Sequence, residues 1–75
     1  MATRKYFLDN NEGGYFDTLT EAKQYVIDNY KPKDVKSGKV QFICGDDWPD
    51  GGHTTTTPIT VSSNGRKIEF GRTTK

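Results

Sequence analysis

One amphipathic segment limits the architecture of this 75-residue chain more than any other feature. Thr18 and Glu21 have the spacing of a capping box, in which a threonine and a glutamate satisfy the free amides of a helix start. Apolar side chains then recur at helical spacing, at Leu19, Ala22, Val26 and Tyr30, with Ile27 widening the stripe. Pro32 ends the segment, because the residue before a proline is pushed out of helical geometry. The pattern predicts one helix over residues 19–30, whose apolar side the rest of the chain must cover.

The remaining segments have the character of short strands. Residues 4–9 and 15–16 carry aromatic residues on either side of the turn formers of residues 10–14, which predicts a hairpin with a five-residue loop. Residues 39–44 alternate as a strand does, and Val40, Phe42 and Cys44 are expected on its inner face. We expect residues 45–57 to form a long loop.

A second hairpin is predicted at the C-terminal end. Asn64–Gly65 is the pair that a two-residue type I′ turn requires. Such a turn would place four apolar side chains on one face, with Val61 opposite Ile68 and Ile59 opposite Phe70. The chain is therefore expected to be a single α+β domain over residues 1–75. One helix packs on a mainly antiparallel sheet, in the order ββαβββ.

Length and composition narrow the class of protein. A chain this short buries only about 60% of the surface that its unfolded form exposes, so self-association as a homodimer would add burial. One cysteine excludes an internal disulfide. No segment approaches the roughly 20 apolar residues of a membrane span, and no apolar run follows the first basic residues as in a secretory signal. We expect a cytoplasmic location.

The stretch from Cys44 to Thr57 contains the only Cys, Trp and His of the chain. Zinc needs about four N or S ligands. Cys44 and His53 would supply only two, so a zinc site would need a second copy of the chain to complete it. The aspartates lack the alternating spacing of a calcium loop. A Cys–His nucleophile pair is disfavoured, because Cys44 is expected to be a buried structural thiol. We therefore expect no metal, no cofactor and no catalytic residue.

Trp48 is the residue of this stretch that most suggests binding. Tryptophan is enriched at interface hot spots, although Trp48 could instead cap one end of the small core. The expected partner-binding residues are Asp46, Asp47, Trp48, Asp50 and His53.

Nucleic acid is the alternative partner. The basic residues expected at such a surface are Lys31, Lys33, Lys36 and Lys39, with Arg66, Lys67, Arg72 and Lys75. Tyr6, Tyr15 and Phe16 could stack on bases. However, the net charge is only +1, without the clear basic excess of proteins that coat nucleic acid.

The residues identify no particular family. A hairpin followed by a helix that opens with Thr18, Leu19, Glu21 and Ala22 is similar in style to small accessory proteins of bacteriophages and other mobile elements. That resemblance implies a short cytosolic protein that binds and blocks a host protein, and it transfers no functional residue. The leading hypothesis is a non-enzymatic protein-binding module acting as an inhibitor of a host protein. The alternative is a weak single-stranded nucleic-acid-binding protein.

Overall fold

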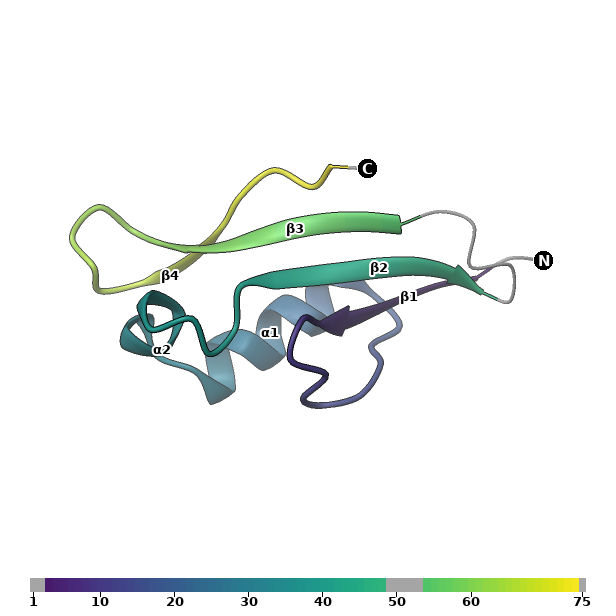
Figure 1. The fold of residues 1–75 in the computed structure, drawn as a ribbon, viewed down its shortest axis with the longest axis horizontal. Helices are drawn as coiled ribbons and strands as arrows, with labels where there is room; N and C mark the ends of the chain where they lie inside the picture. The colour runs from purple at the N-terminus through teal and green to yellow at the C-terminus, as the bar shows by residue number, and fades with distance from the viewer. Residues whose placement is uncertain (1–2, 49–53, 75) are drawn as a thin grey trace.

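A four-stranded antiparallel sheet with a helix against one face forms the framework of the computed structural model, which describes residues 3–48 and 54–74 (Figure 1). The elements follow the order β1 (Thr3–Leu8), α1 (Leu19–Asn29), α2 (Pro32–Lys36), β2 (Phe42–Trp48), β3 (Thr54–Val61) and β4 (Ile68–Phe70). The strands lie in the order β1-β2-β3-β4. The predicted α+β class, a helix packed on an antiparallel sheet, is confirmed.

The start of α1 shows why the helix was predictable. The Glu21 amide donates to Thr18 Oγ1 at 3.1 Å, which is the expected N-cap bond. The Glu21 carboxylate accepts from the Asp17 amide at 3.2 Å. In a reciprocal capping box it would accept from the amide of the N-cap residue, Thr18, instead. The helix ends at Asn29 and Tyr30 is its C-cap. These bonds are local, so they depend on sequence neighbours alone.

The second strand of the predicted first hairpin is reduced to one bridge. Phe16 and Tyr6 exchange backbone hydrogen bonds of 2.9 and 2.7 Å, and the pairing extends no further among the described residues. Helix α1 begins three residues after Phe16, which leaves no length for a strand. The long partner of β1 is instead β2, with Leu8 opposite Ile43.

The inner face of β2 differs from the prediction. Ile43 is buried, whereas Phe42 is 38% exposed and Cys44 is half-buried on the opposite face. The strand begins at Phe42, so Val40 enters the core from the irregular segment before it. Alternation counted from Val40 was therefore out of phase by one residue, and the inward register predicted for Cys44 was wrong.

The C-terminal hairpin has the predicted register: Ile59 pairs with Phe70 and Val61 with Ile68. Its turn is different. The Gly65 amide donates to the Ser62 carbonyl at 2.8 Å, and the Ser62 amide donates to the Lys67 carbonyl at 2.9 Å, which leaves a four-residue loop over 63–66. Gly65 has the expected positive φ of 72°, but the only described non-glycine residue with a positive φ is Asn11, so Asn64 cannot belong to a type I′ turn.

The core lies between α1 and the sheet. Its buried apolar members are Leu8, Ala22, Val26, Tyr30, Val40, Ile43 and Ile59. Phe70 and Ile68 pack against this cluster from β4, as the hairpin register requires. Helix α2 was missed, because the lysines around it were interpreted as a connector. Its local signals are Pro32 at the first helical position and Asp34, whose carboxylate accepts from the Lys31 amide at 2.9 Å.

Tyr30 joins the end of α1 to the loop after β1. Its hydroxyl accepts from Asn10 Nδ2 at 3.0 Å and donates to the Glu12 carboxylate. Asn10 Nδ2 also donates to the Lys39 carbonyl at 2.9 Å. Burial, and then the hydrogen bond to Glu12, raises the pKa of Tyr30 from 10.0 to about 12. The folded chain therefore holds this proton more tightly than the unfolded chain does.

The raised pKa predicts a specific loss of stability in alkali. An unfolded tyrosine ionises near pH 10 and folded Tyr30 near pH 12, so its contribution is complete below pH 10 and is lost as the pH rises to 12. In urea unfolding across this window, the wild type should lose stability more steeply than Tyr30→Phe. Equal slopes for the two proteins would contradict the assignment, since the other tyrosines are common to both.

Candidate binding groove

The stretch predicted as a loop is mostly a hairpin. Gly45 to Trp48 belong to β2, Thr54 to Thr57 belong to β3, and residues 49–53 between them lie outside the described residues. Thr55 and Thr57 are buried on the inner face of β3, with Thr57 only 1% exposed. Threonine is β-branched and fits a strand, so the four consecutive threonines extend the sheet where a loop was expected.

The predicted partner-binding residues do not form one described surface. Asp46 and Asp47 are adjacent in β2 and therefore point to opposite faces. Asp47 Oδ1 accepts from Arg4 Nε at 2.9 Å, so this carboxylate already has an internal partner. The Trp48 side chain, Asp50 and His53 lie outside what the structure describes. The choice between a core cap and a partner contact at Trp48 therefore stays a prediction.

Cys44 has the environment of an unreactive thiol. Burial raises its pKa, and the carboxylates of Asp9 and Asp46 raise it further. A thiol with a raised pKa stays protonated at neutral pH and is a poor nucleophile and metal ligand. Across residues 3–48 and 54–74, no three His, Cys, Asp or Glu side chains lie close enough together to hold a metal ion.

The three aromatic residues proposed for base stacking lie near one another but do not share one face. Tyr6 and Phe16 pack against the core, and Phe16 lies 5.2 Å from Tyr25 between ring centroids. Tyr15 lies beside Phe7, at 5.7 Å. They therefore do not form a shared platform for successive bases.

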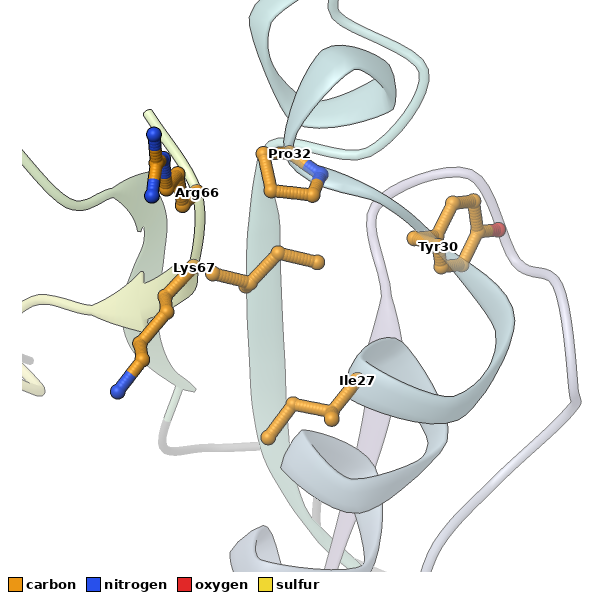
Figure 2. Close-up of a pocket in the computed structure, with 6 residues that line it drawn as sticks. Ile27, Tyr30, Pro32, Arg66 and Lys67 are labelled. Carbon is orange, nitrogen blue, oxygen red and sulfur yellow. The ribbon is translucent and has the colours of Figure 1, made fainter. Parts of the chain in front are cut away.

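A groove of about 340 Å³ lies between the helical end of the molecule and the C-terminal hairpin. Its lining residues are Ile27, Tyr30, Pro32, Arg66, Lys67 and Ile68. Figure 2 shows Ile27, Tyr30 and Pro32 on the helical wall and Arg66 and Lys67 on the facing hairpin wall. Ile27 is 50% exposed, although it was predicted to widen the buried stripe of α1. The groove thus has a mainly apolar helical wall, whereas on the hairpin wall the Lys67 ammonium is directed away from the helix.

The cations around this groove are not neutralised. The ion pairs of the described residues are Arg4–Asp47, Lys5–Asp17 and Lys39–Asp34, and none involves Arg66, Lys67 or Lys36. Lys36 lies close to the hairpin, because a β-carbon added to Gly65 would be only 2.9 Å from Lys36 Nζ. Lys23 Nζ lies 5.4 Å from the Phe70 ring centroid, on the β4 side of α1. Positive charge therefore gathers around the apolar wall.

Part of the predicted nucleic-acid set belongs to the same end of the molecule. Lys33 and Lys36 lie on α2, which Lys31 precedes, and all three are exposed. Lys39 differs, because its ammonium is 3.5 Å from Asp34 Oδ1. Sequence reasoning identified these lysines but missed the groove beside them. The available signal was Ile27, an apolar residue at the margin of the helical stripe.

Comparison of the chain with protein-family models, with curated proteins and with solved structures finds no match. In the part of the chain that is described, no helix has the length and apolar character needed to cross a membrane.

Proposed function

We propose that this protein is a non-enzymatic protein-binding module that holds a segment of its partner in the groove. The main observation is Ile27, a half-exposed aliphatic side chain in a concave site with Pro32 and Ile68. Single exposed apolar residues are common on protein surfaces. Here, however, several surround one hollow beside unpaired cations, which is the arrangement of a binding site with an apolar interior and a polar rim.

The wider role that we propose is that of a phage-type accessory protein that works in the cytoplasm by binding and blocking a host protein. Its support is the resemblance in style between the helix opening at Thr18, Leu19, Glu21 and Ala22 and that of such proteins. Association into a homodimer remains a separate prediction, which sedimentation at high micromolar concentration would test.

Single-stranded nucleic acid is the second candidate, because Lys31, Lys33 and Lys36 add to the cations of the groove. The chemistry of the apolar wall is less favourable to it. Bases bind best by stacking on exposed aromatic rings. Tyr30, the aromatic residue of this wall, is only 9% exposed and has its hydroxyl bonded to Asn10 and Glu12. The groove therefore favours a protein partner.

Ile27→Asp should weaken partner binding by at least about tenfold, because burial of an isoleucine side chain contributes about 1.5–3 kcal/mol. The test is capture from a lysate of the source cells on the immobilised protein, with the captured material quantified. Thr20→Asp is the matched control, since it places the same charge at an exposed position of the same helix. It should bind as the wild type does, and both variants should melt near the wild-type temperature.

Three outcomes would contradict the proposal. Equal capture by wild type and Ile27→Asp would exclude the groove as the binding site. Capture that disappears after nuclease treatment would favour the nucleic-acid alternative. Log-linear weakening of binding with log salt would indicate the same alternative, because phosphate contacts release counterions.

A further inference from the structure

We infer that two copies of this chain pair through the free edge of β4. The two β4 strands run antiparallel, with Ile68 opposite Ile68 of the second copy. This inference goes beyond the proposed function, because it concerns a sheet edge and a second copy of the chain, and it does not depend on what the groove binds. It gives the separate prediction of a homodimer a defined surface and register.

The two edges of the sheet differ in how their backbone groups are satisfied. At the β1 edge, the Tyr6 amide and carbonyl are bonded to Phe16, and the Leu8 carbonyl accepts from the Asn11 amide at 2.9 Å. Strand β4 lies at the other end of the sheet. Among the described residues, no hydrogen bond covers its outer side. The β4 edge is therefore open to pairing with another strand.

The ladder between β3 and β4 shows which backbone groups form this open edge. The Ser62 amide donates to the Lys67 carbonyl at 2.9 Å, so these two residues form a hydrogen-bonded pair. Such pairs alternate with non-hydrogen-bonded pairs along an antiparallel ladder. Ile68 and Phe70 therefore belong to the non-hydrogen-bonded pairs, and their amides and carbonyls point away from β3.

The outer face of β4 carries two charges of opposite sign. Lys67 and Glu69 alternate with Ile68, so their side chains point away from the core, and Figure 2 shows the Lys67 side chain directed away from the helical wall. Their neighbours on β3 are the uncharged residues Ser62 and Thr60. None of the ion pairs in the described part of the chain includes either side chain. Both charges are therefore free to meet a second chain.

These charges select one register of self-pairing. With Ile68 opposite Ile68 of the second copy, each Lys67 lies opposite Glu69 of the other copy, which gives two cross-strand pairs of opposite charge. A register centred on Glu69 would place two carboxylates opposite each other, and one centred on Phe70 would place both charges opposite uncharged residues. Short charged edges usually prevent strand pairing. Here, the alternation of sign is complementary to its own antiparallel copy.

Sedimentation equilibrium of two charge-reversal variants tests this inference. The wild type should show a reversible monomer–dimer equilibrium at high micromolar concentration. Lys67→Glu and Glu69→Lys should each weaken dimerisation several-fold, because each places like charges opposite each other in both cross-strand pairs. An equimolar mixture of the two variants should form a heterodimer at least as readily as the wild type dimerises, since both facing pairs then have opposite charges.

Two further variants complete the test. The chain with Lys67→Glu and Glu69→Lys together should dimerise as the wild type does. Lys33→Glu, the same charge reversal at an exposed position of α2, should leave dimerisation unchanged. All variants should melt near the wild-type temperature, because Lys67 and Glu69 are exposed and face no charge within their own sheet.

Three results would overturn the inference. A wild type that stays monomeric at high micromolar concentration would exclude the dimer. Unchanged dimerisation of both single variants would place the contact between copies elsewhere. Weakened single variants whose mixture does not recover dimerisation would exclude the antiparallel register. Capture of a partner by wild type and Ile27→Asp is a separate measurement, so the dimer and the proposed function can fail independently.

Discussion

Leu8→Ala is expected to lower the free energy of unfolding by about 3 kcal/mol, within the usual range of 2–5 for a buried leucine. Leu8 is 0% exposed and faces Ile43 across the β1–β2 pair, so truncation removes apolar contacts and leaves a cavity at the centre of the core. A single core in a domain this small rarely supplies more than about 3–5 kcal/mol. Most of the stability should therefore be lost in urea unfolding followed by circular dichroism.

Ile27→Ala is the matched comparison for this variant. It also truncates an aliphatic side chain, but one that is 50% exposed at the groove, so its cost should be much smaller. If Leu8→Ala fails to fold, Leu8→Val allows the same comparison with a smaller cavity. Equal stability of the Leu8 and Ile27 alanine variants would show that the core is placed wrongly.

Gly45→Ala is expected to destabilise the sheet by about 2 kcal/mol, a typical cost of overpacking. A β-carbon at Gly45 would collide with Thr55 Oγ1 and would lie 2.9 Å from Tyr6 Cε1. Both neighbours are constrained, since Thr55 is buried and Tyr6 is bridged to Phe16. The glycine therefore leaves room in the sheet for the Tyr6 and Thr55 side chains, which lie on the strands on either side of it. Thermal and urea unfolding measure the loss.

A double-mutant cycle tests the cause of that loss. Thr55→Ala removes the colliding hydroxyl, so Gly45→Ala should cost less in the Thr55→Ala background than in the wild type. Strictly additive costs would contradict the steric explanation and would indicate that the glycine is needed for another reason.

The helix and the C-terminal hairpin illustrate what local sequence can predict. The Thr18 cap acts within three residues and Pro32 acts on the residue before it, so neither needs a distant partner. In the hairpin, the pairing of Val61 with Ile68 survives even though the turn is a four-residue loop, because both turns bring the same residues opposite each other. Local rules gave the correct register here without the correct turn geometry.

The register of β2 shows where such rules fail. Val40, Phe42, Ile43 and Cys44 are all apolar enough to be buried, so alternation alone could not select a face. The choice follows from Leu8 and Thr57, which flank Ile43 on the two neighbouring strands. The threonines of β3 were likewise assigned to a loop, since their polar side chains do not show in the sequence that they pair with β2.

The candidate groove also combines residues that the sequence reveals with an arrangement that it does not reveal. The lysines around α2 and the pair Arg66–Lys67 are visible in the sequence, and so is Ile27 at the edge of the helical stripe. Their meeting is not visible, because it requires the hairpin to lie beside the end of α1. By itself, the sequence determined the helix, its limits and the hairpin register, since each depends on neighbours a few residues away. Only the tertiary structure decided the β1–β2 pairing, the inner face of β2 and the groove, since these depend on contacts between segments that the sequence places far apart.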